Sequence, residues 1–157
     1  MQARRGNAME NPTGPLVLIV DDEAPIRQME RRILQKGGYR IMEASGAAEA
    51  LAMLGAVNPD LLIADLDMPG LCGEEMVRRI HAVRPNLKVL YVTAHIDRLL
   101  DAQSLVWEGE AFLDKPFTSA GLLEAVALLC TGSITGARPS MTDTGGHVGE
   151  WLKGGGK

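Results

Sequence analysis

Residues 60–70 read DLLIADLDMPG, and this stretch decides the fold. Its apolar run, residues 61–64, has the length and the unbroken hydrophobicity of a strand buried on both faces, as the strands of a parallel sheet are. The run ends abruptly in Asp65, and the turn formers Pro69 and Gly70 follow shortly after. A carboxylate at the end of a buried strand costs folding free energy, so a residue of this kind is usually kept for a function. Asp65 is therefore the first candidate for a functional residue.

The same texture recurs on both sides of this stretch. Short apolar runs predict five strands, at residues 16–20, 40–43, 61–64, 89–92 and 111–113. Helical spacing follows most of them, with apolar stripes at Ile26/Met29/Ile33, Ala47/Ala50/Leu51/Leu54, Met76/Ile80/Val83 and Leu122/Val126/Leu129. A further helix, the fourth, is expected at about residues 97–108, where apolar residues lie on several sides. This alternation predicts an α/β fold: a five-stranded parallel sheet in the flavodoxin-like order 2-1-3-4-5, doubly wound with five helices.

The two ends of the chain differ from this central part. Residues 1–14 are polar and lack periodicity, so they are expected to form a flexible leader. Residues 131–157 contain eight glycines and six serines or threonines, a composition that cannot bury enough surface to offset its ordering entropy. The sequence thus predicts one folded domain at 15–130, followed by a linker or disordered tail without an output domain.

Composition excludes several classes of protein. A formal charge of −4 argues against direct binding of nucleic acid, which usually requires a strongly basic surface. No apolar stretch reaches the length of a membrane span, and no apolar segment follows Arg4 and Arg5 as in a signal peptide. A cytoplasmic location is expected, with no membrane partner. Cys72 and Cys130 lie in no metal-ligand spacing, so they are interpreted as reduced thiols.

Polar side chains follow the predicted strands at their carboxyl ends. Asp21 and Asp22 follow the first strand, Asp65 the third and Thr93 the fourth, while Lys115 closely follows the fifth. Because ligands of an open parallel sheet bind at these ends, the side chains are expected to converge there.

The charges at this edge indicate the chemistry. Three aspartates and one lysine sum to −2, which one divalent cation would neutralise. Mg²⁺ prefers hard oxygen ligands and retains several waters, which suits carboxylates together with a phosphoryl oxygen. A carboxylate is a competent nucleophile toward phosphorus, so Asp65 can form an aspartyl phosphate. Thr93 and Lys115 are suited to hold phosphoryl oxygens.

Four segments in this order resemble the response-regulator receiver family: residues 17–23, residues 60–70 with Gly73, residues 92–94 and residues 112–117. The resemblance covers roughly residues 15–130. It implies a two-component phosphorelay switch that accepts a phosphoryl group on Asp65 from a histidine kinase or a histidine phosphotransfer domain. Such a switch signals to a downstream protein, here unknown, through the face formed by the fourth helix, fifth strand and fifth helix. A homodimer through that face is among the assemblies that the resemblance allows.

The resemblance also implies a metal site. Asp22 and Asp65 are expected to bind Mg²⁺ directly, the backbone carbonyl of Asp67 supplies a third ligand, and Asp21 acts through water. Mn²⁺ is an acceptable substitute. The protein is not expected to be an enzyme, beyond catalysing its own aspartyl phosphorylation and dephosphorylation.

The remaining roles concern switching. The Thr93 hydroxyl is expected to turn toward the phosphoryl group, and Lys115 to pair with it, preceding Pro116 across a cis peptide bond. Phe112 occupies the aromatic switch position. Asp67 and His95 stand where the family tunes the lifetime of the phosphate.

Other interpretations stay open at this point. The chain can be a receiver excised from a hybrid sensor kinase or a larger regulator. Asp65-Leu66-Asp67 is also similar to the motif of aspartate-nucleophile phosphohydrolases, although there the motif ends the first strand. A pseudo-receiver that binds without phosphorylation is disfavoured by the complete set of site residues. Asp21 or Asp22 could simply cap a helix, Phe112 could be core, and His95 a solvated loop residue.

Overall fold

The computed structural model describes residues 13–69, 73–97 and 109–131. Five strands form one parallel sheet: β1 (Leu16–Val20), β2 (Arg40–Ala44), β3 (Leu61–Asp65), β4 (Lys88–Thr93) and β5 (Glu110–Asp114). Their spatial order is β2-β1-β3-β4-β5, and every neighbouring pair is parallel. The predicted strands and the predicted strand order are confirmed, each strand to within one residue at either end.

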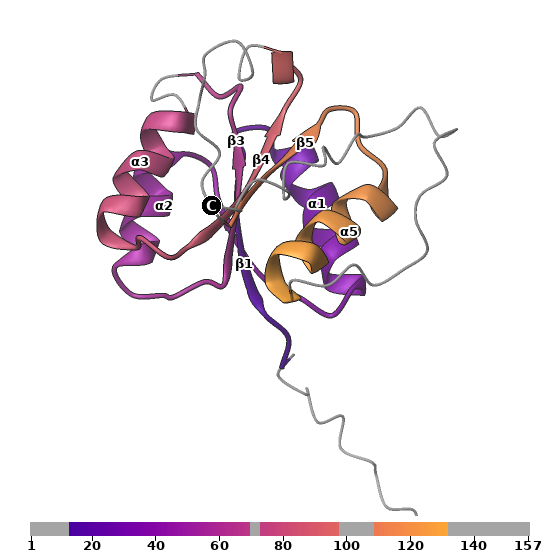
Figure 1. Ribbon diagram of the computed structural model, residues 1–157, viewed down its shortest axis with the longest axis horizontal. Coiled ribbons are helices and arrows are strands. Elements are labelled where there is room, and N and C mark those ends of the chain that lie inside the picture. The colour runs from indigo at the N-terminus through magenta and orange to yellow at the C-terminus, as the bar shows by residue number, and fades with distance from the viewer. Residues whose placement is uncertain (1–12, 70–72, 98–108, 132–157) are drawn as a thin grey trace, which may run out of the picture.

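Four helices within the described residues cover the sheet: α1 (Ala24–Lys36), α2 (Ala47–Leu54), α3 (Gly73–Val83) and α5 (Ser119–Thr131). Figure 1 shows α2 and α3 on one face of the sheet and α1 and α5 on the other. The doubly wound arrangement is therefore confirmed. Residues 98–108, which hold nearly all of the predicted fourth helix, lie outside the described residues.

Local sequence explains where α1 begins and ends. Pro25 stands in the first turn, where a missing backbone N–H does no harm and a fixed φ favours the helix. The helix ends at Lys36, and Gly38 then adopts a φ of +89°, a left-handed conformation that glycine tolerates best. The chain turns from there directly into β2.

The strands are buried on both faces, which is why their sequences are almost continuously apolar. Along β1, Val17 and Ile19 pack with the helices α1 and α5, whereas Leu18 and Val20 pack with α2 and α3. Two hydrophobic layers thus hold the sheet rigidly. In the described part of the chain, no helix is long and apolar enough to cross a membrane.

Two residues of the predicted apolar stripes are exposed. Met29 is 41% exposed and Val83 is 63% exposed, so the prediction that they face the core is wrong. The buried residues of α1 are Glu30 and Leu34, which means that the buried face is rotated by about one residue. Because Glu30 is an acidic residue, a search for apolar residues at helical spacing does not find that face. Val83 is the last residue of α3, beyond the part that packs on the sheet.

Candidate functional site

The carboxyl edge of the sheet carries the polar residues predicted for the site. Asp21 and Asp22 follow β1 directly, Asp65 is the last residue of β3, and Thr93 is the last residue of β4. Lys115 follows β5. These five side chains come from segments that are far apart in the sequence. They meet because parallel strands end at the same edge of the sheet.

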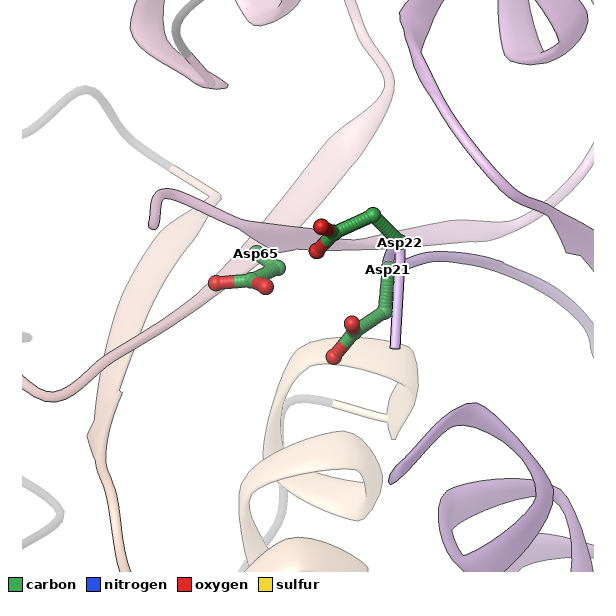
Figure 2. A group of neighbouring side chains, drawn as sticks. All are labelled: Asp21, Asp22 and Asp65. Atoms are coloured by element: carbon green, nitrogen blue, oxygen red, sulfur yellow. The ribbon is translucent and has the colours of Figure 1, made fainter. Parts of the chain in front are cut away.

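Three carboxylates gather at the centre of this edge. Asp21, Asp22 and Asp65 each offer one carboxylate oxygen, and these atoms lie within 4.8 Å of one another. Figure 2 shows the three side chains reaching from two neighbouring strands into one shared space. Asp21 and Asp65 are buried, with 1% and 2% exposed, while Asp22 is exposed. The cluster is therefore open to solvent on the Asp22 side.

Lys115 supplies the positive charge of the site. Its Nζ lies 3.2 Å from Oδ1 of Asp65 and 3.8 Å from Oδ2 of Asp21. Burial alone would lower the pKa of Lys115, but the Asp65 and Asp21 carboxylates outweigh burial, and the pKa is raised. The ammonium group is thus charged at all physiological pH values and bridges the two buried aspartates.

Asp21 is under electrostatic stress. Burial raises the pKa of its carboxyl group to about 6, with the Asp65 carboxylate adding to the rise, against a hydrogen bond from the Glu23 backbone that lowers it. The Glu23 amide donates to Asp21 Oδ1 over 2.7 Å. Oδ2 of Asp21 is buried and makes no hydrogen bond within the described part of the chain. A buried oxygen of this kind is suited to a water or a cation.

Asp67 makes contacts that its position in a loop does not suggest. Its carboxylate accepts a hydrogen bond from Thr93 Oγ1, at 3.1 Å from Oδ1 and 3.3 Å from Oδ2. The Ala94 backbone amide donates to Asp67 Oδ2 over 2.8 Å. In turn, the Asp67 amide donates to Asp65 Oδ1 over 2.9 Å. Asp67 therefore connects the ends of β3 and β4 across the edge of the sheet.

Three other predicted residues contribute no side chain to the carboxylate cluster. The Phe112 ring is buried and stacked on Tyr91, with ring centroids 4.9 Å apart, in the layer beneath α2 and α3. The His95 side chain is exposed, although its backbone amide donates to Thr93 Oγ1 over 3.0 Å. Pro116 follows Lys115 across a cis peptide bond.

Sequence reasoning missed two features of the site. The first is Glu30, a carboxyl group buried in α1 that senses the charges of Asp21, Lys115 and Asp65. Its spacing of four residues from both Ile26 and Leu34 could have placed it on the buried face. The second is the side chain of Asp67, for which only a backbone role in metal binding and an effect on phosphate lifetime were predicted. No sequence signal indicates which donors that side chain binds.

The acidic cluster fits a Mg²⁺ site. Its members are all carboxylates, the ligand type that Mg²⁺ prefers, and the buried Oδ2 of Asp21 lacks a donor within the described residues. Clustered carboxylates repel one another, and a bound divalent ion would relieve that repulsion.

Comparison with protein families gives one matching model, described as the response regulator receiver domain, over residues 17–127. Among curated proteins, the chemotaxis protein CheY of Thermotoga maritima is 31% identical over 114 residues, covering 72% of this chain and 95% of CheY. The C4-dicarboxylate transport transcriptional regulatory protein DctD of Rhizobium meliloti is 32% identical over 111 residues. That match covers 71% of this chain but only 24% of DctD.

Solved structures agree with these matches. The response regulator protein TrrA of Thermotoga maritima, in complex with Mg²⁺-BeF, is 34% identical and superposes with a TM-score of 0.66, covering 73% of this chain and 98% of that one. The chain spans about a quarter of the length of several of the curated relatives, such as DctD and the regulator NtrC of Escherichia coli.

Proposed function

The chain belongs to the response regulator receiver domain family, and from this premise we propose that Asp65 accepts a phosphoryl group from a histidine kinase or a histidine phosphotransfer protein. Acceptance of a phosphoryl group is the general function of the family, whose members act as signalling switches and generally not as enzymes. The proposal assigns that function to particular residues of this chain.

One observation carries the assignment. The Asp65 carboxylate lies at the carboxyl edge of the sheet with Lys115 Nζ 3.2 Å from Oδ1 and the two other carboxylates of the acidic cluster beside it. A carboxylate nucleophile needs no general base, because it carries no proton that has to be removed. Positioning and charge neutralisation, which supply most of the catalysis of phosphoryl transfer, are the tasks for which these neighbours are suited.

The transfer step follows from this geometry. A carboxylate oxygen of Asp65 attacks the phosphorus of a phosphohistidine in line with the phosphorus–nitrogen bond. That bond breaks, its electron pair returns to the imidazole of the donor, and the imidazole takes up a proton. The product is an acyl phosphate on Asp65. The Lys115 ammonium group offsets negative charge on the phosphoryl oxygens during the transfer and holds the Asp65 carboxylate in place.

We assign a Mg²⁺ site to the acidic cluster, with Mn²⁺ as an acceptable substitute. Asp22 and Asp65 would bind the ion directly, the backbone carbonyl of Asp67 would complete the protein ligands, and Asp21 would act through water. Bound there, the metal would offset the repulsion between the aspartates and an incoming phosphate. Burial, and after it the Asp65 carboxylate, raises the pKa of Asp21, and a cation at this position would counter both effects.

The switching residues form the next part of the proposal. Thr93 and Lys115 are suited to bind the phosphoryl oxygens. Phe112 lies on β5 two residues before the end of that strand, and its ring, stacked on Tyr91 of β4, would respond to movement of Thr93 at the end of β4. We propose that the signal leaves through the face that includes β5 and α5, toward a downstream protein. A longer parent protein is compatible with this role, since DctD and NtrC are much longer than this chain.

The experiment is covalent labelling read by intact mass. With acetyl phosphate and Mg²⁺, the wild-type protein is expected to gain the mass of one phosphoryl group, and Asp65→Asn none. Asp97→Asn removes one negative charge from an exposed position outside the acidic cluster and serves as the matched control, expected to label like the wild type.

Two results would contradict the proposal. Labelling of Asp65→Asn to the wild-type extent would mean that another residue is the acceptor. Sustained multiple turnover of a generic aryl phosphate would instead favour a phosphohydrolase, whose aspartyl phosphate is a transient intermediate.

A further inference from the structure

The two hydrogen-bond donors that end β4 are already in use. Thr93 Oγ1 donates to the Asp67 carboxylate, and the Ala94 amide donates to Asp67 Oδ2 over 2.8 Å. A threonine hydroxyl and a backbone amide each carry a single proton. Neither donor can therefore serve a second anion with full strength while Asp67 holds it.

The same two hydrogen-bond donors follow the strand that pairs with β3, at whose end Asp65, the proposed phospho-acceptor, lies. Asp67 is linked back to Asp65, since its own amide donates to Asp65 Oδ1 over 2.9 Å. A phosphoryl group on Asp65 would bring three anionic oxygens to this edge of the sheet. At the end of β4, the donors available to these oxygens are the Thr93 hydroxyl and the Ala94 amide, and both already donate to the Asp67 carboxylate.

The Thr93 hydroxyl is also oriented toward Asp67. The His95 amide donates to Thr93 Oγ1 over 3.0 Å, so one lone pair of the hydroxyl is used and its proton is left to point elsewhere. Thr93 is 1% exposed, which keeps solvent from competing for that proton. The carboxylate of Asp67 is the acceptor that the proton meets.

We propose that the Asp67 carboxylate is a built-in competitor of the transferred phosphoryl group, which must displace it from Thr93 Oγ1 and from the Ala94 amide. The inference rests on the proposed function of Asp65. Asp67 is exposed, so its side chain can swing into water without disturbing the core. Release is further driven by repulsion, because a phosphoryl dianion and the carboxylate would face the same donors.

The test measures initial labelling rates, so that later hydrolysis of the acyl phosphate does not contribute. Asp67→Ala, which empties both donors, is expected to label with acetyl phosphate and Mg²⁺ roughly ten-fold faster than the wild type, as expected when charge-assisted hydrogen bonds no longer have to be broken. Asp67→Asn keeps one acceptor oxygen and should fall between the two. Asp97→Asn, with the same loss of charge at another exposed position, should label at the wild-type rate.

A double mutant separates displacement from simple charge repulsion. Thr93→Ala removes one of the two contested donors, so adding Asp67→Ala to it should accelerate labelling by a smaller factor than in the wild type. Pure repulsion would give the same factor in both backgrounds. The Ala94 amide resonance provides a direct readout: it should shift upfield in unphosphorylated Asp67→Ala and return downfield when beryllofluoride with Mg²⁺ is added.

The outcomes are distinct. If wild-type Asp65 is not labelled at all, the proposed function fails and the competitor falls with it. If the wild type is labelled but both Asp67 variants are labelled at the wild-type rate or more slowly, Asp67 does not compete with the phosphoryl group, while the proposed function of Asp65 stands. An equal acceleration with and without Thr93 would also overturn it.

Discussion

Glu30 lies on the buried face of α1, where its side chain is 1% exposed. Burial, followed by the Asp21 carboxylate, raises the pKa of the Glu30 carboxyl group to about 8, and its Oε2 makes no hydrogen bond within the described residues. The group therefore mostly carries a proton at pH 7. In the unfolded chain the pKa of this group is near 4.5, so between pH 4.5 and about 8 folding is accompanied by uptake of a proton.

This proton linkage predicts how stability changes with pH. The contribution of Glu30 is fully present below its unfolded pKa and is lost as pH rises toward about 8, so unfolding free energy should fall across that range. The fall should be on the order of a few kcal/mol. Glu30→Gln, which stays neutral, should remove most of the slope and be more stable than the wild type at pH 8. Urea unfolding at a series of pH values in EDTA measures this.

Two details sharpen that measurement. Asp21, whose pKa burial raises to about 6, contributes a slope of the same sign at lower pH, and this part should persist in Glu30→Gln. Glu124→Gln on α5 serves as the control and should keep the wild-type profile. A slope unchanged by Glu30→Gln would mean that another group takes up the proton.

The sequence predicted the position of a single site residue correctly where the strand topology alone determines that position. Asp21, Asp65, Thr93 and Lys115 were predicted to meet because each stands at the end of a parallel strand, and strand ends align whatever the side chains do. The Asp67 carboxylate could not be assigned in that way, because its partners depend on a side-chain rotamer and a loop path. Both are settled only when β3 and β4 are fixed side by side.

At the scale of elements, α3 begins unusually close to the acceptor strand. A methyl group on Gly73 would lie 2.8 Å from the carbonyl oxygen of Asp65 and 2.9 Å from the Cα of Leu66. Only a residue without a side chain permits this approach, so the first turn of α3 and the end of β3 support each other. The geometry around Asp65 thus depends on a helix that contributes none of the clustered carboxylates.

Gly73→Ala should consequently disturb the site through the backbone of Asp65 and Leu66. Because backbone atoms have to move, we expect a loss of roughly 1–3 kcal/mol in unfolding free energy and slower labelling of Asp65. Gly55→Ala is the matched control: its added methyl group would lie 3.4 Å from the Ala52 carbonyl oxygen, and Gly55 already has a helical φ of −69°. Chemical denaturation and the mass assay together decide. A fully stable, normally labelled Gly73→Ala would refute the coupling.

Elements were predictable to different degrees. Strands emerged clearly because both of their faces are buried and their sequences are continuously apolar. The rotation of α1 did not, since Glu30 breaks the apolar period on the very face that packs against the sheet. At the end of α3, Val83 continues the apolar period, yet it lies 63% exposed, because periodicity does not reveal where the covering sheet stops.

At the scale of the whole molecule, the acidic cluster opposes folding unless it is neutralised. Lys115 compensates one charge of the three aspartates. At Asp21, where burial is the main cause of the raised pKa, the Asp65 carboxylate also raises the pKa by more than Lys115 lowers it, so this compensation is incomplete. A cation that binds only the folded state would shift the folding equilibrium by mass action. Metal binding at the proposed site would therefore be linked to global stability.

We accordingly expect Mg²⁺ to raise the melting temperature of the wild type. At a concentration about one hundred times its Kd, the ion should add about 2.7 kcal/mol to the unfolding free energy. Asp22→Asn, which removes the exposed ligand, should lose most of that gain while folding normally without metal. Asp97→Asn should retain it. Equal stabilisation of Asp22→Asn and the wild type in thermal melts would place the ion elsewhere.

The alignment of strand ends has a consequence for how such a chain can diverge. The polar residues of the candidate site lie at the carboxyl edge of the sheet, whereas the turns at residues 37–39, 55–60 and 84–87 lie at the opposite edge. Insertions at that distal rim could accumulate over evolutionary time without touching the chemistry. Division of the chain into two separate proteins at residues 84–87, in contrast, would leave Asp65 on one protein and Thr93 and Lys115 on the other, so neither could inherit the switch.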